Sequence, residues 1–536
     1  MGKRKKRMLL SNREDTGLKV IRFERKPTSV WSIRTRKLGK PLKKEKQMIT
    51  KQNVSASFCN RLHWNQIQWE QCEKHTKRLQ ARIVQAVKQR RWNKVKALQR
   101  LLTRSYSAKV LAVKRVTTNR GKHTPGIDKE VWDTSTKKFQ GIKSLKPRGY
   151  RTKPLRRIYI PKANGKKRPL GIPTMADRAM QALHLMSLSP VAETTGDLHS
   201  YGFRTYRSAA DAMEQIFNVL ANRYAPDWIL EGDIQKCFDE IDHQWLLSKI
   251  PMEKSILRKW LKSGFMERKA LYPTHTGTPQ GGIASPTLAN MALDGLEETI
   301  AKIFGKPGSQ KRKKYGINLV RYADDFIVTG KSKELLETQV KPIISKFLSE
   351  RGLTLSIEKT KITHIENGFD FLGQTVRKYK RKLIIKPSQK SIKRLIERIR
   401  SFLRKNRTET QEMVIKFLTP QIRGWAYYHR HICARKVYEK VDHQIFQLLW
   451  RWSKRRHPNK GLRWVKKRYF NQVKTRLWSF GTMIRKKNKK MYLELFQASN
   501  VSIKRHKKVQ CTANPFDREW YEYFEKRKTN HLKAVS

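Results

Sequence analysis

Apolar residues recur at helical spacing in the stretch from Trp64 to Thr103. They fall on two successive faces with basic residues between them, a pattern that predicts amphipathic helices. By contrast, residues 1–56 lack sustained periodicity, and we expect an extended arm or a disordered tail. Gly and Pro punctuate residues 117–128, where we expect a loop. The two predicted faces contain Leu79, Ile83 and Val87, followed by Val95, Leu98 and Leu102.

Short strand-like runs begin near residue 155. The runs LRRIYIPK and KKRPLGIP flank the turn dipeptide Asn164-Gly165, which predicts a β-hairpin. Helical stretches separate further strand-like runs, so we predict that the middle of the chain is mixed α and β. These further runs lie at 228–230, 318–320 and 326–329.

After residue 376 the pattern becomes mostly helical again. The segment SIKRLIERIRSFLRKN (391–406) predicts an amphipathic helix with a cationic outer surface. A merely solvated face and a face that tracks phosphates are equally good interpretations of this helix alone. Its apolar stripe contains Ile392, Leu395, Ile396, Ile399, Phe402 and Leu403, and its cationic surface contains Lys393, Arg394, Arg398, Arg400 and Arg404.

The charge balance indicates the kind of partner. The 536 residues include 120 Lys and Arg against 43 Asp and Glu, a net charge of +77, while the 38% hydrophobic content still permits packed cores. A compact protein with this charge would repel itself, and nucleic acid is the best counterweight because neutralised phosphates release counterions. Aromatic residues interleave with cations in Trp450-Arg451-Trp452 and could stack on bases, although any single Trp is more often core.

Five cysteines are present, and no two of them have a metal-ligand spacing. No His cluster accompanies them, so we expect a reducing compartment and no structural zinc. No apolar run approaches the ~18 residues of a membrane span, and the N-terminus lacks the apolar core of a secretory signal. We therefore expect an intracellular protein without a membrane partner, in bacterial cytoplasm or in plastid stroma.

Candidate chemistry comes from aspartates that border apolar runs. In VRYADDFIVTG (320–330), Asp324 and Asp325 are expected at a hairpin turn, where Asp is common without any function. Asp233 in WILEGDIQKCFDEIDH is expected at a strand end. Nucleotide polymerisation uses two Mg²⁺ ions roughly 3.5–4 Å apart, held by few carboxylates together with substrate phosphates. Three carboxylates this close would repel one another without metal, so we expect two Mg²⁺ ions beside them.

Six sequence blocks, in order, resemble those of reverse transcriptases. The box at 322–325 resembles the family signature, and DIQKCFD (233–239) resembles its first catalytic aspartate block. The resemblance implies an α+β right-hand polymerase, with fingers and palm built on a mixed or antiparallel sheet and an α-helical thumb. The other blocks are IYIPKANGKKRPLGIPTMADR (158–178), GTPQGGIASPTLAN (277–290), GLTLSIEKTKI (352–362) and FDFLGQTVR (369–377).

The resemblance also implies roles for individual catalytic residues. Asp233 and Asp324 would be metal ligands, and Asp325 would be the third catalytic carboxylate. The backbone carbonyl of Ile234 would complete the metal site.

Other residues would contact the incoming nucleotide by the same resemblance. Lys162 and Arg168 would bind its triphosphate, and Gln280 would line its pocket. Phe238 stands where the family places an aromatic that collides with a ribose 2′-hydroxyl, which predicts a preference for deoxynucleotides. An ordinary core aromatic is the alternative for Phe238. Asp239 could cap a helix, and no role follows for it.

Segments outside these blocks resemble one branch of the family, the reverse transcriptases and maturases encoded by group II introns. The branch implies three partners: group II intron RNA, target DNA as primer and insertion site, and deoxynucleoside triphosphates. Many such proteins continue into a C-terminal HNH endonuclease with Cys pairs and clustered His, which we do not expect here. The segments are 112–132, as in the N-terminal extension, 423–430, as in the maturase or X domain, and 449–470, as in cyanobacterial and algal-plastid proteins.

Two alternatives remain beside an active polymerase and maturase. One is a splicing-only maturase with a vestigial polymerase site, which the intact aspartates disfavour. The other is a retron or defence enzyme, which would not be expected to carry both 423–430 and 449–470. The domains implied are a basic arm at 1–60, a helical RNA-binding extension at 61–140, fingers and palm at 141–376, the maturase domain or thumb at 377–448, and a basic DNA-binding region at 449–536.

Overall fold

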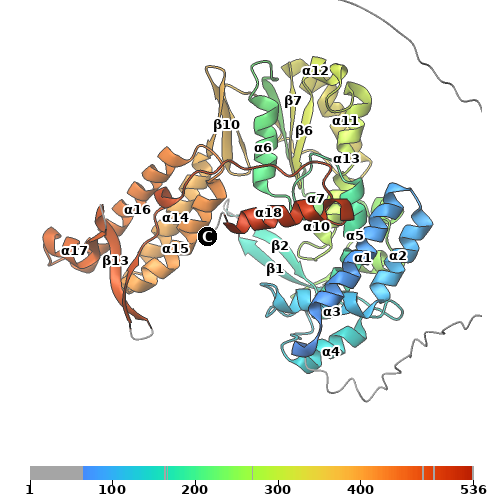
Figure 1. Ribbon diagram of the computed structural model, residues 1–536, viewed down its shortest axis with the longest axis horizontal. Helices are drawn as coiled ribbons and strands as arrows, with labels where there is room; N and C mark the ends of the chain where they lie inside the picture. Colours follow the sequence, from blue (N-terminus) through green and yellow to red (C-terminus); the bar gives the residue numbers. More distant parts are fainter. Residues whose placement is uncertain are drawn as a thin grey trace, which may run out of the picture. The chain divides into compact units, whose positions relative to one another are not determined.

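The fold is α+β, with four sheets and two large apolar cores in the part of the chain that is described. The predicted arm at 1–60 and Lys162 lie outside that part. The computed structural model describes residues 64–161, 165, 167–268, 270–473, 476–486 and 489–533 (Figure 1).

The amphipathic stretch predicted from Trp64 to Thr103 folds as two helices, and both predicted apolar faces are buried. Ser105 begins the next helix by accepting a hydrogen bond from the backbone N–H of Ala108. That helix continues through Thr118 because its apolar face is buried, so the predicted loop begins later than expected. The helices are α1 (Trp69–Lys88), α2 (Trp92–Arg104), α3 (Tyr106–Thr118), α4 (Ser135–Ser144) and α5 (Met175–Thr195).

The central sheet has the strand order β6-β7-β3-β8, and all its pairings are antiparallel. Successive residues of a strand enter different cores: Leu230 packs with the N-terminal helices, whereas Ile229 packs with α6 and the C-terminal helices. Burial on both faces explains the continuous apolar runs in the sequence. The strands are β3 (Trp228–Gly232), β6 (Asn318–Tyr322), β7 (Asp325–Gly330) and β8 (Lys361–His364), and α6 is Ala209–Leu220 (Figure 1).

The hairpin predicted near residue 155 forms the first two strands of a second sheet, β2-β1-β4-β5. Strand β1 pairs parallel to β4, so this sheet is mixed. Its strands are β1 (Leu155–Pro161), β2 (Lys167–Ile172), β4 (Phe265–Glu267) and β5 (Ala270–Tyr272). The remaining helices of this half are α7 (Cys237–Glu240), α8 (His243–Lys249), α9 (Lys254–Leu261), α10 (Ser285–Leu293), α11 (Leu296–Phe304), α12 (Gln310–Tyr315) and α13 (Lys341–Ser349), the last preceded by a π-helical turn at Leu335–Val340.

The C-terminal helices share one core with the segment after them. The helix predicted at 391–406 is α14, and the centre of its apolar stripe is buried. The expected domain limits at 140, 376 and 448 fall inside α4, β10 and α16, so the chain has no structural break there. The elements are β9 (Phe369–Phe371), β10 (Gln374–Tyr379), β11 (Lys382–Pro387), α14 (Gln389–Lys405), α15 (Gln411–His429), α16 (Arg435–Arg456), α17 (Leu462–Tyr469), β12 (Phe470–Val473), β13 (Arg476–Lys486) and β14 (Lys489–Glu494).

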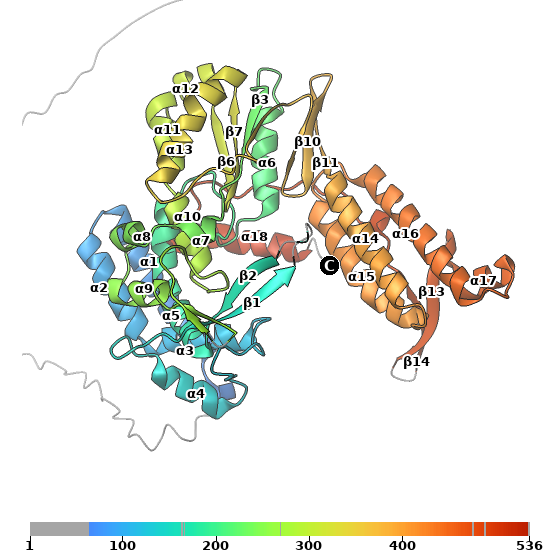
Figure 2. The ribbon, with the colours of Figure 1, turned by 180° about the vertical axis from the view of Figure 1, so that it is seen from behind.

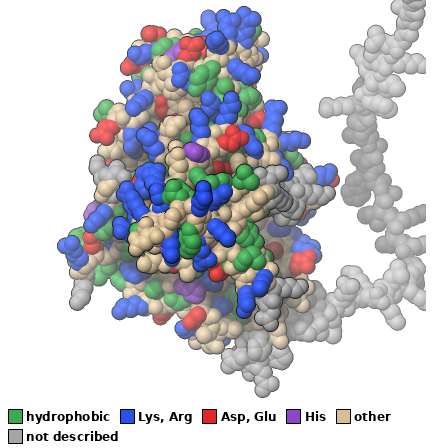
Figure 3. All heavy atoms as spheres, turned by 90° about the vertical axis from the view of Figure 1, so that its left-hand side faces the viewer, with side chains coloured by type: hydrophobic (Ala, Val, Ile, Leu, Met, Phe, Trp, Pro, Cys, Tyr) green, Lys and Arg blue, Asp and Glu red, His purple; other side chains and the backbone are tan. Residues whose placement is uncertain are grey.

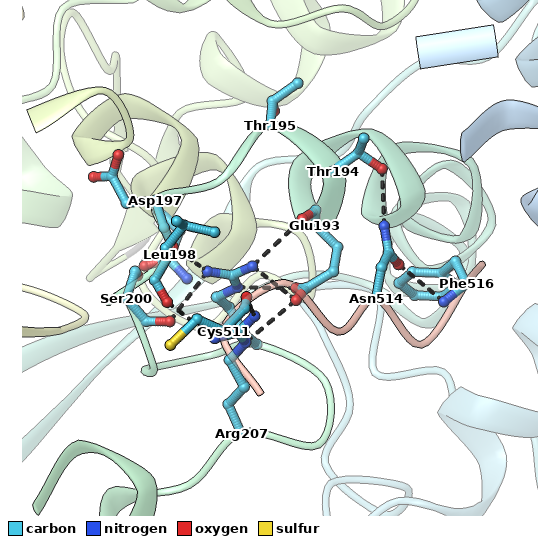
Figure 4. Close-up of polar contacts among 12 residues, drawn as sticks. Glu193, Thr194, Thr195, Asp197, Leu198, Ser200, Arg207, Cys511, Asn514 and Phe516 are labelled. Atoms are coloured by element: carbon cyan, nitrogen blue, oxygen red, sulfur yellow. Dashed lines mark hydrogen bonds and ion pairs between the residues drawn. The ribbon is translucent and has the colours of Figure 1, made fainter. Parts of the chain in front are cut away.

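After β14 the chain returns to α5 and α6 (Figure 2). Arg207 donates a hydrogen bond to the backbone carbonyl of Cys511 at 2.8 Å, and Asn514 donates to the hydroxyl of Thr194 at 2.9 Å (Figure 4). The region expected at 449–536 is therefore divided, because its first part packs with α14–α16 and its last part packs with α5 and α6. The last helix is α18 (Tyr521–Lys533).

Candidate active site

Asp324 and Asp325 lie at the tip of the β6–β7 hairpin. Tyr322 pairs with Asp325 across a two-residue turn, in which Ala323 has a φ of 58°. A non-glycine residue in this left-handed region is uncommon, and it turns the chain tightly enough to bring two carboxylates to the tip. The hairpin predicted from the apolar runs is confirmed.

Asp233 comes directly after β3, which is the neighbour of β7. Gly232 pairs with Phe326, so Asp233 and Asp325 are placed beside each other where the two strands end. A Cβ at position 232 would lie 2.2 Å from the Phe326 ring. Only glycine permits this close approach of the two strands, and it lies next to the aspartate. The expected strand-end position of Asp233 is confirmed.

The three carboxylates influence one another. Burial raises the pKa of Asp324, and repulsion from Asp233 raises it further. Burial, together with repulsion from Asp324 and Asp233, raises the pKa of Asp325 to about 6, although its side chain is partly accessible at the start of β7. The site therefore concentrates negative charge that a bound cation would relieve.

Lys359 is a site residue that the sequence analysis missed. Its Nζ lies 2.7 Å from Oδ2 of Asp233, and this hydrogen bond raises the pKa of Lys359. The segment is held beside β3 because the backbone N–H of Ser356 donates to the carbonyl of Asp233 at 2.8 Å. Lys359 and Lys361 lie in the same sequence block (352–362), and only the pairing with β3 distinguishes the lysine that reaches the site.

The donor chemistry of the three aspartates suits a divalent cation, because carboxylate oxygens are hard ligands. In the described ranges no three carboxylate, imidazole or thiol groups converge into a ready-made metal cluster. The ammonium of Lys359 contacts one oxygen of Asp233 at 2.7 Å. Ile234, whose carbonyl was expected to complete the metal site, is buried next to Asp233. Mutual repulsion and hard donors make the aspartates a fit for a cation.

A buried guanidinium supports the hairpin from its inner side. Arg321 in β6 is fully buried, contacts the carboxylate of Asp294 and lies 3.8 Å from that of Asp197. It also donates to the side chain of Asn290 at 3.2 Å and to the carbonyl of Ala323 at 3.4 Å. The arginine thus ties the turn to α10 and its C-terminal end. A charged residue inside an apolar strand was the signal for this role in the sequence.

Two of the expected nucleotide-binding residues contact each other. Nε of Arg168 donates to Oε1 of Gln280 at 3.1 Å, and the Gln280 amide donates to both carboxylate oxygens of Asp239 at 3.0 Å. Asp239 does not cap a helix in this arrangement but orients the Gln280 amide. Arg168 is exposed on β2, where an anion can reach it. Lys162 lies outside the described residues.

Phe238 is partly buried against the larger core and contacts Phe203 edge-on, with ring centroids 6.2 Å apart. The backbone N–H of Thr278 donates to the carbonyl of Phe238 at 2.6 Å. Phe238 therefore lies beside the glycine-rich segment that carries Gln280. Its partial burial is compatible with both predicted roles, the nucleotide contact and the core aromatic.

Comparison with known proteins identifies the family. Three family models match: N-terminal domain of reverse transcriptase at 64–145, reverse transcriptase (RNA-dependent DNA polymerase) at 160–376, and group II intron, maturase-specific domain at 392–470. Protein YkfC of Escherichia coli is 31% identical over 326 residues, which cover 53% of this chain and 84% of that protein. The chain belongs to the group II intron reverse transcriptases and maturases.

Further relatives support the same branch. The group II intron-encoded protein LtrA of Lactococcus lactis is 33% identical over 347 residues, which cover 53% of this reverse transcriptase and 57% of LtrA. The solved structure of Candida albicans telomerase, in complex with a fragment of telomeric RNA, covers 59% of this chain and 64% of its own, with 14% identity and a TM-score of 0.36. That score carries no weight in the assignment.

The right-hand polymerase fold gives names to the parts. We call the central sheet with its three aspartates the palm, the β2-β1-β4-β5 sheet the fingers, and α14–α16 the thumb. Reverse transcriptases generally use divalent metal ions, and the maturase-specific match implies RNA binding. None of the helices in the described ranges is long and apolar enough to cross a membrane.

Proposed function

We propose that this reverse transcriptase copies group II intron RNA into DNA at Asp233, Asp324 and Asp325 and binds the same RNA to assist splicing. The observation that carries the polymerase half is the position of Asp233 beside Asp325 where β3 ends and β7 begins, with Asp324 in the adjoining turn. In a chain with a net charge of +77, a local concentration of carboxylates needs a specific explanation. Binding of two Mg²⁺ ions supplies that explanation.

Each residue of the site has a distinct part in this proposal. Asp233, Asp324 and the Ile234 carbonyl hold the metal ions, with Asp325 as the third carboxylate. When bound, the pair of ions activates the primer 3′-hydroxyl and neutralises the triphosphate. The role of Lys359 is to occupy Asp233 and limit repulsion until the site is loaded.

The nucleotide side of the site selects and orients the deoxynucleoside triphosphate. Arg168 and Lys162 contact the phosphates by charge-assisted hydrogen bonds. Gln280 is held by Asp239 and lines the pocket. Phe238 discriminates against a ribose 2′-hydroxyl.

Target DNA serves as primer and insertion site, and the protein works in bacterial cytoplasm or plastid stroma.

Primer extension on an RNA template tests the polymerase half. Wild-type protein with Mg²⁺ should extend a DNA primer with deoxynucleotides, and the Asp324→Ala, Asp325→Ala double variant should not. Equal extension by the two proteins would contradict the polymerase assignment. If wild-type protein accelerates splicing of its intron RNA but extends no primer, the splicing-only maturase is the correct function instead.

A further inference from the structure

A cavity of about 360 Å³ lies in the thumb, where the C-terminal ends of α14 and α16 meet. Its floor is apolar and includes the buried Leu403 and Trp452. No acidic residue lines it. On the side of the molecule drawn in Figure 3, Lys and Arg side chains are spread among hydrophobic ones and are more frequent than Asp and Glu. We call the cavity the arginine cradle after six lining residues: Arg400, Arg404, Arg407, Arg451, Arg455 and Arg456.

Three of the six arginines already have partners. Nε of Arg451 donates to the backbone carbonyl of Gln447 on its own helix at 3.3 Å. Arg400 pairs with Glu397 on its own helix. Arg456 donates to the backbone carbonyls of Arg407 and Glu409 and lies over the Trp452 ring at 4.7 Å. These contacts fix the position of Arg456 and of the chain after α14. On this side of the cradle, the side chain of Arg456 is therefore held in place by hydrogen bonds.

Four of the arginines are exposed and have no carboxylate partner among the described residues. Across the described ranges, no carboxylate lies within ion-pair distance of Arg404, Arg407, Arg451 or Arg455. Four guanidinium groups around one hollow repel one another, and only an anion with several charges would satisfy them together. The cavity is of the size that proteins use for ligands.

Helix ends alone do not explain this concentration of charge. The C-terminus of a helix carries about half a negative charge, and cations in the last turn stabilise it. Arg404 on α14 and Arg455 on α16 are in last turns and satisfy that need. Arg451 lies more than one turn before the end of its helix, and Arg407 lies beyond the end of α14. These two extra cations point to an external anion.

We propose that the arginine cradle binds the phosphate backbone of structured RNA. Arginine presents a planar fork that matches two phosphate oxygens at once, and neighbouring phosphates of a strand can engage several forks. The occupant is RNA rather than DNA because the cradle lies wholly within the maturase-specific match at 392–470. The assignment rests on the maturase half of the proposed function and not on the polymerase half.

The test compares two full-length double variants that remove the same charge. Arg404→Gln, Arg451→Gln empties the cradle, whereas Arg394→Gln, Arg398→Gln changes two exposed arginines of α14 that do not line it. The probe is a labelled RNA stem-loop, with a DNA stem-loop of the same sequence beside it. Binding is measured over a range of KCl concentrations, and primer extension on a short RNA template is measured in parallel.

We expect the cradle variant to weaken RNA binding about tenfold and to lower the slope of log K against log salt by about 1–2, as the loss of two phosphate contacts requires. The control variant should change affinity by less than about twofold, since dispersed surface charge contributes weakly. Primer extension by the control variant should stay at the wild-type level, because that variant leaves both the palm and the cradle intact. An inactive wild-type polymerase would refute the polymerase proposal and leave the RNA comparison readable.

Three results would contradict the proposal that the arginine cradle binds RNA. One is an equal loss of RNA affinity in the cradle and control variants, which would mean that net charge alone explains the effect. Another is an equal loss of affinity for the RNA and DNA stem-loops, which would make the surface a general nucleic-acid site. The third result comes from the double variant Arg404→Lys, Arg451→Lys, which keeps the charge but removes the planar guanidinium groups. This variant also tests the proposal if the Gln variant does not fold. RNA affinity of this Lys variant equal to wild type would exclude arginine-specific phosphate binding.

Discussion

The palm and the thumb each concentrate charge of one sign, but they handle it differently. In the palm, Asp324 and Asp325 are crowded against Asp233, and the charge is partly relieved by one lysine. In the thumb, four arginines are exposed around a hollow without ion-pair partners in the described ranges. Crowded carboxylates suit a compact multivalent cation, whereas dispersed exposed guanidinium groups suit an extended polyanion.

The support beneath each site differs in the same way. The palm hairpin rests on Arg321, which is fully buried and paired with Asp294. The cradle arginines surround an apolar floor, and the described residues that form this floor carry no charge. In the palm, a buried ion pair therefore supports the fold. In the thumb, the exposed arginines lie on the surface of helices that pack through apolar residues. Substitutions should separate these two situations.

The largest effect is expected from Asp324→Asn. Loss of a carboxylate ligand should remove several kcal/mol of metal-dependent transition-state stabilisation, which corresponds to a rate lower by about 10³-fold or more. RNA affinity should be unchanged, because the thumb is intact. Single-turnover primer extension and RNA binding measured on the same preparation check both halves. A matched decrease in RNA affinity would show that the palm and the thumb are not separable.

Arg321→Met should give the next largest effect, on stability. Removing one partner leaves Asp294 buried without its cation, which costs about 3–5 kcal/mol. The free energy of unfolding from urea titration measures it. The double variant Arg321→Met, Asp294→Leu should recover part of the loss, because it also removes the stranded charge. No recovery would mean that the arginine acts through the hairpin carbonyl or Asn290 instead.

Local patterns predicted the parts of the palm that depend on neighbouring residues. The apolar runs placed Asp324 at a hairpin turn and Asp233 at a strand end, because strand burial is encoded by consecutive residues. The apolar stripe of α14 was predicted for the same reason. The roles of these aspartates come from the resemblance to reverse transcriptases, and they remain predictions until the substitutions are measured.

Contacts between distant segments could not be predicted from patterns. Lys359 reaches Asp233 only because the chain after α13 pairs with β3. The cradle exists only because α14 and α16 end at the same place, and neither helix shows it alone. The expected domain limit at 448 falls inside α16, so it does not coincide with the end of an element. Composition indicates which surfaces are exposed and which partners they suit, whereas the fold depends on the apolar face that each element buries.

A smaller effect is expected from pH in the palm. The pKa of Asp325 is raised from 3.8 to about 6, so between these values the metal-free folded state binds a proton more tightly than the unfolded state. Its stability therefore falls as pH rises through this window. Asp325→Asn removes this dependence and should be more stable near neutral pH by about 1 kcal/mol, a value reduced for the partial solvent access of the carboxyl.

Thermal unfolding with and without Mg²⁺ measures this effect. Without metal, the Asp325→Asn protein should unfold at a temperature higher by about a degree or two, because a chain of this size responds weakly to 1 kcal/mol. With Mg²⁺ the order should reverse, since the cation stabilises the ionised carboxylates of the wild type. A wild-type protein that is the more stable of the two without metal would contradict the repulsion inferred for the palm.

The smallest effect is expected from Arg455→Gln in the thumb. This exposed arginine has no carboxylate partner in the described ranges, so its loss should change the free energy of unfolding by no more than about 0.5 kcal/mol. The direction should be slightly stabilising, because one source of repulsion within the cradle disappears and outweighs its favourable contact with the helix end. Urea titration at low salt, where surface electrostatics are least screened, gives the sharpest measurement. A loss approaching that of Arg321→Met would mean that the thumb arginines belong to the fold, and the contrast between the palm and the thumb would not hold.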